Sequence, residues 1–110
     1  MIFRLVIIVF FALVYYIVNM VKYLDEVVKQ VKKGSIPKNI FLHFNNAFLS
    51  LDITKDLSLF DIKQLKTSEN TGRIYYRLRK GKYRAIFYIE EENIFVIAID
   101  KREEVYKKWQ

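Results

Sequence analysis

The sequence predicts an α+β fold, in which a helical hairpin packs on a small antiparallel β-sheet and an apolar segment precedes both. Three observations predict it. Apolar side chains recur at helical spacing between residues 21 and 51, the period changes to two between residues 73 and 100, and residues 5–21 are almost wholly apolar. With 110 residues, the chain has room for one compact domain with a single core.

Residues 1–21 form the most apolar part of the chain, and Arg4 is their one charged side chain. From Leu5 to Val18 every residue is apolar or aromatic, and one asparagine interrupts the run before residue 21. As a helix this run would be roughly 25 Å long, just short of the roughly 30 Å of hydrocarbon in a bilayer. We therefore divide the chain into an N-terminal segment, residues 1–21, and a domain, residues 22–110.

Three interpretations of the N-terminal segment stay open. It is a short membrane anchor, a buried first strand and helix start, or an extension that is absent if translation begins at Met20. An anchor would leave the domain in the cytoplasm, tethered to the inner face of the membrane, because more basic residues follow the run than precede it. The basic residues that follow are Lys22, Lys29, Lys32 and Lys33.

Two helices are expected to open the domain as a hairpin. The first ends at Gly34, a residue that suits the left-handed conformation after a helix. The second starts with Ser35 as its cap and Pro37 in its first turn. Between residues 52 and 65 we expect an irregular connection to the sheet. The apolar stripes of the two helices consist of Val21, Leu24, Val27, Val28 and Val31, and of Ile40, Phe41, Phe44, Phe48 and Leu51.

Three strands are expected to follow as a meander. The first starts at Arg73, and Lys80 and Gly81 form the two-residue turn to the second, which ends at about Glu90. The third runs from Ile94 to Asp100. In the first strand Ile74, Tyr76 and Leu78 point one way and Tyr75, Arg77 and Arg79 the other, which is typical of a strand with one buried face.

The predicted turn places Arg77 directly opposite Arg84, on the face that points away from the apolar pairs. Two like charges in that position destabilise a sheet by up to about 1 kcal/mol, so an anion is expected between them. The twelve residues from Arg73 to Arg84 contain six basic and no acidic side chains, with tyrosines among them. With a net charge of +7, such a surface favours RNA over an incidental solvated face.

The composition excludes several kinds of chemistry. The absence of cysteine excludes disulfides, a thiol nucleophile and a thiolate metal site, and His43 is the one histidine of the chain. Little is left for a zinc site or a catalytic triad. We therefore expect no metal and no cofactor.

Residues 73–109 combine, in order, a strand ending in R-x-R, a turn with G-x-Y-R, an acidic loop, an apolar strand and an ending with K-R followed by V-Y. This ordered combination resembles the C-terminal part of toxins of the RelE/ParE superfamily. The motif FDIKQLK, at residues 60–66, resembles the segment that precedes the sheet in that family.

The resemblance implies a RelE-like fold and a metal-independent endoribonuclease that cuts messenger RNA, in many members on the ribosome. The reaction that it implies is attack of a 2′-hydroxyl on the neighbouring phosphate, which gives a 2′,3′-cyclic phosphate and a 5′-hydroxyl end. The partners that it implies are a cognate antitoxin protein, messenger RNA and the ribosome. Membrane contact is expected only if residues 1–21 are an anchor.

Matched position by position, the resemblance assigns four catalytic residues. Arg84 is the arginine of the turn motif, Arg77 the basic residue of the preceding strand, Arg102 the arginine of the K-R pair and Tyr106 the tyrosine of the ending. The arginines would stabilise the phosphorane, and the tyrosine would protonate the leaving oxygen. Further residues expected to bind RNA are Arg73, Tyr75, Arg79, Lys80, Lys82 and Lys101.

One position departs from the pattern of the family. Tyr75 stands where a second basic residue is expected, two positions before Arg77, and the acceptor of the 2′-hydroxyl proton is thereby unassigned. Two alternatives therefore stay open. One is a ParE-like toxin, which inhibits DNA gyrase without nuclease activity, and the other is an inactive relic that binds RNA.

Overall fold

The computed structural model describes residues 4–10, 21–66 and 72–109, with side chains up to residue 105. Residues 4–10 are helical. The elements that follow are β1 (Val21–Tyr23), α2 (Asp25–Lys33), α3 (Lys38–Thr54), the 3-10 helix η1 (Leu57–Leu59), β2 (Ile62–Gln64), β3 (Tyr76–Lys80), β4 (Tyr83–Glu90), β5 (Asn93–Lys101) and α4 (Arg102–Trp109).

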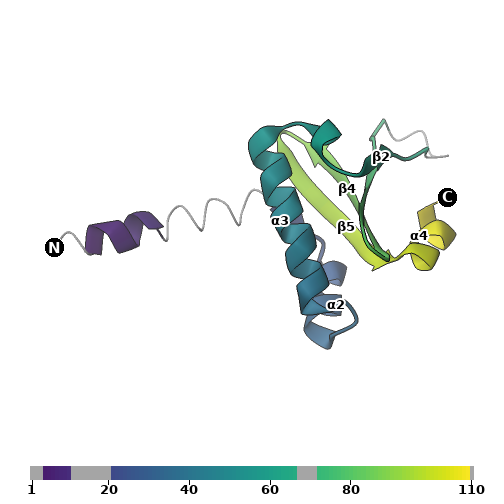
Figure 1. Ribbon diagram of the computed structural model, residues 1–110, viewed down its shortest axis with the longest axis horizontal. Coiled ribbons are helices and arrows are strands. Elements are labelled where there is room, and N and C mark those ends of the chain that lie inside the picture. The colour runs from purple at the N-terminus through teal and green to yellow at the C-terminus, as the bar shows by residue number, and fades with distance from the viewer. Residues whose placement is uncertain (1–3, 11–20, 67–71, 110) are drawn as a thin grey trace.

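The strands form one five-stranded sheet with the order β1-β5-β4-β3-β2. β1 runs parallel to β5, and all other neighbours are antiparallel. The predicted α+β class and the meander of β3, β4 and β5 are confirmed, while the sheet has two more strands than expected. Figure 1 shows α3 along one side of the sheet and α4 on the other side.

The main core lies between the sheet and the helices α2 and α3. The ring of Phe48 from α3 meets that of Phe87 from β4 edge-on, with 5.1 Å between the ring centroids. The apolar stripe predicted for the second helix is confirmed: Phe44, Phe48 and Leu51 are buried in the core, and Ile40 and Phe41 pack against it, partly buried. The helices contribute Val27, Phe44, Ala47, Phe48 and Leu51 to this core, and the strands contribute Val21, Leu78, Ala85, Phe87, Ile94, Val96 and Ile99.

The first helix of the domain begins later than the sequence predicted. Apolar spacing predicted a helix from Val21, but Val21–Tyr23 form β1, and α2 begins at Asp25. The N–H of Leu24 donates to the carbonyl oxygen of Val96 at 2.9 Å, so the chain stays beside β5 up to the start of α2. Three residues are too few to distinguish the two-residue period of a strand from the 3.6-residue period of a helix.

Tyr23 joins β1 to α3. Its hydroxyl donates to Oδ1 of Asn45 at 2.7 Å, and its ring lies 5.0 Å from that of Phe41. Burial raises the pKa of the phenol above its ordinary value, so this hydroxyl keeps its proton and donates at neutral pH.

Two further expectations about the connections were wrong. Pro37, not Ser35, is the residue before the first turn of α3, since its fixed φ holds the extended conformation that precedes a helix. The connection after α3 is not irregular throughout, because Ile62–Gln64 pair with β3 as the edge strand β2. Gly34 ends α2 in the left-handed conformation, as predicted.

The turn between β3 and β4 lies one residue later than predicted. Gly81 and Lys82, rather than the pair before, form the two-residue loop. Gly81 has a φ of +59°, a conformation that tight hairpin turns require and that glycine adopts without strain. The expected register is therefore wrong by two residues: Arg79, and not Arg77, lies opposite Arg84.

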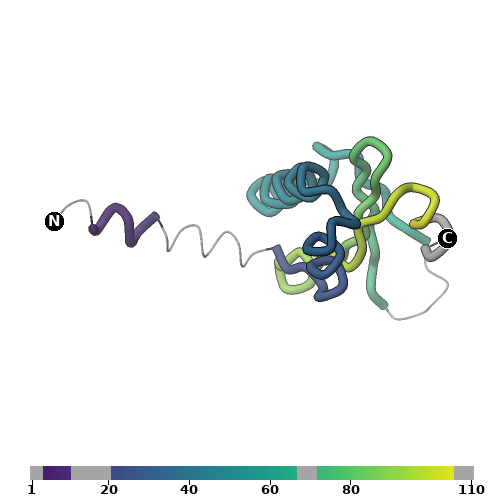
Figure 2. Tube along the Cα trace, turned by 90° about the horizontal axis from the view of Figure 1, so that it is seen from below, coloured from purple at the N-terminus to yellow at the C-terminus, as the bar shows by residue number. Residues whose placement is uncertain are grey.

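The N-terminal helix, residues 4–10, stands apart from the sheet and its helices in both views (Figures 1 and 2). The apolar side chains from Leu5 to Phe10 are between 48% and 67% exposed. Within the described residues, no helix is both long enough and apolar enough to cross a membrane. The three interpretations of residues 1–21 fall largely outside the described residues, which omit 1–3 and 11–20.

The turn between β4 and β5 carries strain that one substitution should relieve. Glu91 and Glu92 form its loop with φ values of +50° and +67°, where a side chain costs about 1 kcal/mol or more. We expect Glu92→Gly to raise the free energy of unfolding by about 0.5–1 kcal/mol, since the greater entropy of glycine in the unfolded chain cancels part of the gain. Urea unfolding followed by circular dichroism measures the change.

Glu90→Gly is the matched control, because Glu90 lies in the extended β4 and glycine weakens a strand. It should lower the free energy of unfolding. A Glu92→Gly variant no more stable than the wild type would show that the turn is unstrained.

Candidate nucleic-acid interface

The sheet has one face covered by α2 and α3, and we call the other one the open face. Side chains of Arg77, Arg79, Arg84 and Tyr88 point to it, because the residues between them in β3 and β4 belong to the main core. The helix α4 contacts β4 and β5 and covers part of this face. Val105 of α4 and Ile86 of β4 are buried outside the main core.

Four charged residues lie side by side across the strands of the open face: Asp61, Arg79, Arg84 and Asp100, the charged row. Arg79 lies opposite Arg84, and Arg84 opposite Asp100. The N–H of Arg79 donates to the carbonyl oxygen of Asp61 at 3.0 Å. Two cations at the centre of the row are thus flanked by two carboxylates. Sequence reasoning expected an external anion here and missed both aspartates, because only the pairing of the strands reveals them.

Arg84 is a buried cation, with 4% of its surface exposed. Its Nη1 donates to the carbonyl oxygen of Gly81 at 2.7 Å and to that of Tyr83 at 2.9 Å. These two hydrogen bonds from Nη1 offset part of the cost of burying the guanidinium. Arg84 therefore braces the turn between β3 and β4 from within and places a fixed positive charge beneath it.

Arg77 and Arg79 share one carboxylate. Nη2 of Arg77 lies 3.5 Å from Oδ1 of Asp61, and Nε of Arg79 lies 3.7 Å from Oδ2. These contacts are longer than the 2.7–2.9 Å or so of a strong charge-assisted hydrogen bond. The side chain of Arg77 is 15% exposed, and its Nε is buried without a hydrogen-bond partner in the described part of the chain.

The first residue of α4 lies beside the same turn. The N–H of Arg102 donates to the carbonyl oxygen of Lys82 at 2.9 Å, and Lys101 lies opposite Tyr83. Tyr106 follows one helical turn after Arg102 within α4, and its side chain lies outside those that the structure describes. The backbones of five candidates lie around this turn: Lys80, Lys82, Arg84, Lys101 and Arg102. Lys80 and Lys101 both lie opposite Tyr83, which packs against the main core, so their side chains belong to the other face of the sheet from that of Arg84.

A stack of side chains, which we call the aromatic column, occupies the other end of the open face. The rings of Tyr88 and Phe95 are stacked, with centroids 4.9 Å apart and 12° between their planes. The guanidinium of Arg73 lies 4.0 Å from the centroid of Tyr88, and Nζ of Lys22 lies 5.8 Å from that of Phe95. These are cation–π contacts, so the outward-facing rings already have cations against them.

Arg73 and Tyr75 belong to this end, away from the turn. The ring of Tyr75 meets that of Tyr88 edge-on at 5.9 Å, and a hydrogen bond with Tyr75 raises the pKa of Arg73. Tyr88 lies four positions after Arg84 in β4, which is about 13 Å in a strand. The two candidates therefore lie apart from those gathered at the turn.

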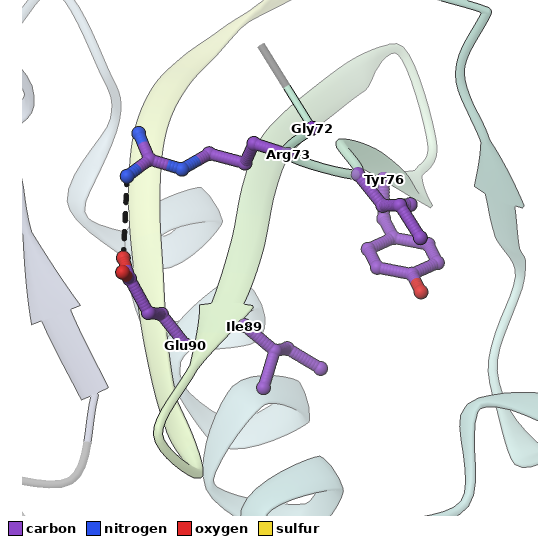
Figure 3. Close-up of a pocket in the computed structure, with 6 residues that line it drawn as sticks. Gly72, Arg73, Tyr76, Ile89 and Glu90 are labelled. Carbon is purple, nitrogen blue, oxygen red and sulfur yellow. Dashed lines mark hydrogen bonds and ion pairs between the residues drawn. The ribbon is translucent and has the colours of Figure 1, made fainter.

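A cavity of about 370 Å³ opens next to the aromatic column and is lined by Gly72, Arg73, Ile74, Tyr76, Ile89 and Glu90. Figure 3 shows Arg73 reaching over to Glu90 on one side of it, with Ile89 and Tyr76 on the other side. The ion pair between Arg73 and Glu90 measures 3.2 Å. Of the residues predicted to bind RNA, this cavity contains Arg73 alone.

Removing the brace under the turn should destabilise the domain. We expect Arg84→Ala to lower the free energy of unfolding by about 2–3 kcal/mol, because two turn carbonyls lose a charged donor. Arg79→Ala, which removes the opposite and 56% exposed cation, should change it by at most about 0.5 kcal/mol. Urea unfolding of both variants measures the difference. Equal stabilities would mean that Arg84 does not brace the turn.

This chain is similar to solved structures of RelB–RelE antitoxin–toxin complexes. No protein-family model matches the chain, and no curated protein matches it. The RelE toxin in a RelB–RelE antitoxin–toxin complex from Methanococcus jannaschii is similar in structure, with a TM-score of 0.60 and 23% identity over 81% of this chain and 99% of that chain. The archaeal RelE–RelB complex from Pyrococcus horikoshii OT3 gives a TM-score of 0.52 and 26% identity, over 76% and 93%.

Proposed function

We propose, from the RelE-type toxin fold of this chain, that the protein is the toxin of a toxin–antitoxin system and an endoribonuclease that cuts messenger RNA without a metal ion. The observation that supports this most is the gathering of cationic residues around the turn of Gly81 and Lys82. Guanidinium groups suit phosphodiester cleavage, because negative charge grows on the phosphate in the transition state.

Cleavage would start with attack of a 2′-hydroxyl oxygen on the adjacent phosphorus. The bond from phosphorus to the 5′ oxygen breaks, which leaves a 2′,3′-cyclic phosphate and a 5′-hydroxyl end. In this proposal Arg77 and Arg102 neutralise the phosphorane, and Tyr106 gives its proton to the leaving oxygen. The 2′-hydroxyl proton passes to solvent, because an arginine is already protonated and accepts none.

The remaining basic residues have different parts in the proposal. Arg84 acts through its fixed charge and through the turn that it braces, since its Nη1 is engaged with two carbonyls. The residues nearest the turn contact the phosphates that flank the cut: Arg79 from the open face, Lys82 from the loop, and Lys80 and Lys101 from the other side of the sheet. Arg73 and Tyr75, at the aromatic column, contact a nucleotide farther along the chain.

We also propose a cognate antitoxin as the protein partner, because both similar structures are RelB–RelE complexes. Apolar side chains are available to such a partner, among them Ile53 and Leu59, which are 76% and 64% exposed. A cavity of about 260 Å³ lies between the end of α3 and the β4–β5 turn. An amphipathic segment of an antitoxin would cover apolar surface of this kind. The ribosome would present the messenger RNA.

Primer extension on messenger RNA in a reconstituted translation reaction tests the nuclease. The wild-type chain should produce discrete cuts, and Arg77→Gln should reduce the cutting rate about 100-fold, as the loss of one charge-stabilising group does in other enzymes. Lys29→Gln on α2 is the matched control, because it removes the same charge from an exposed position on another element. It should cut like the wild type.

Intact messenger RNA with folded wild-type protein would contradict the nuclease. Inhibition of gyrase supercoiling by the same protein would then support the ParE-like alternative, which Tyr75 in place of a basic residue leaves open. If Arg77→Gln and Lys29→Gln cut messenger RNA equally well, the protein would be a nuclease, but Arg77 would not be part of its active site.

A further inference from the structure

We propose that Asp61 is a built-in competitor of RNA for Arg77 and Arg79, so that its carboxylate limits how tightly the open face binds a phosphate. The inference rests on the proposed function for the identity of the ligand. Its basis in the structure is one carboxylate whose two oxygens face two different guanidinium groups. A phosphate presents the same charge and the same kind of oxygen to such a pair.

The backbone holds Asp61 in place independently of its side chain. Its carbonyl oxygen accepts the N–H of Arg79 at 3.0 Å, and the next residue, Ile62, pairs with Leu78 at the start of β2. The side chain is therefore presented to the two arginines by the strand itself. It can also swing away without any change in the sheet, since the described residues give it no bond besides these two cations and no burial to keep it there.

The two ion pairs are weak enough to exchange. Their distances of 3.5 and 3.7 Å exceed those of strong charge-assisted hydrogen bonds, and Asp61 and Arg79 are each 56% exposed, so water and salt screen the attraction. Arg77 in contrast is mostly buried and keeps its Nε without a hydrogen-bond partner among the described residues. A phosphate can approach Nη2 of this guanidinium more closely than the carboxylate at 3.5 Å does.

If Asp61 competes with RNA, removal of its charge should strengthen RNA binding, and this change in affinity can be measured. With Asp61 in place, the three groups carry a net charge of +1, and without its charge they carry +2. Asp61→Asn should therefore lower the Kd for single-stranded RNA about 3- to 10-fold at low salt. It should also steepen the slope of log K against log salt by about 0.7, because one more phosphate is neutralised. A purely structural role of Asp61 would not steepen this slope.

The test is fluorescence anisotropy of a labelled 2′-O-methyl oligonucleotide, which cannot be cleaved, titrated with the full-length chain at several salt concentrations. Glu26→Gln on α2 is the matched control for the change in net charge, and should leave the Kd within about 2-fold of the wild type. Asp61→Glu keeps the charge and should bind as the wild type does. In the Arg77→Gln background, Asp61→Asn should give a smaller gain.

Two outcomes would overturn the inference, and a third would overturn the proposed function as well. Equal affinities of Asp61→Asn and Glu26→Gln would make Asp61 an ordinary ion pair at the sheet edge. Weaker binding by Asp61→Asn would mean that the carboxylate orients the arginines for RNA instead of competing with it. Binding of RNA by none of the proteins, together with intact messenger RNA in the translation reaction, would overturn the proposed function itself. If the wild type cleaves messenger RNA but Asp61→Asn leaves the Kd for RNA unchanged, only the role of Asp61 would be wrong and the proposed function would stand.

Discussion

The hydrogen bonds from Arg84 to the carbonyl oxygens of Gly81 and Tyr83 fix the arrangement on which the rest of the open face depends. They brace a two-residue turn, and the turn sets the register of β3 against β4. That register decides which side chains lie opposite one another on the two strands, so that Arg79 lies opposite Arg84. A buried guanidinium is costly unless its donors are satisfied, so turn and cation stabilise each other. The cation at the centre of the charged row is thus also part of the framework that holds the row.

The sheet places its longest strands at its centre. β4 and β5 pair over eight positions, whereas the edge strands β1 and β2 are three residues each. This order brings β5, which leads directly into α4, next to the strand that carries Arg84. Arg102 consequently lies at the turn although 18 positions of sequence separate it from Arg84. The proximity of the candidate cationic residues is a property of strand order, not of any single motif.

Much of the fold could be predicted because its long elements follow a clear period. The apolar stripe of α3 and the alternation that leads through β3 are examples. The short strands could not be predicted, since three apolar-alternating residues in β1 are compatible with a helix. The register of the hairpin could not be decided either. Moving the loop by one residue changes the partner of each residue by two positions and leaves every side chain on the same face. Both registers therefore bury the same apolar side chains, and the hydrophobic pattern does not distinguish them. Asp61 and Asp100 became visible as neighbours of the arginines only through the pairing.

The aromatic column gives the open face two unlike ends. At the end with Tyr88 and Phe95, the cations Arg73 and Lys22 already lie against ring faces, and Arg73 also contacts Glu90. At the end with Arg77 and Arg79, the cations meet one screened carboxylate at long distance. The arginines at the Asp61 end can therefore exchange their carboxylate for a ligand, whereas the cations at the aromatic end are already held by rings and by Glu90. A linear ligand bound along the strands would therefore have a different binding free energy in each of its two orientations, even without recognition of any base.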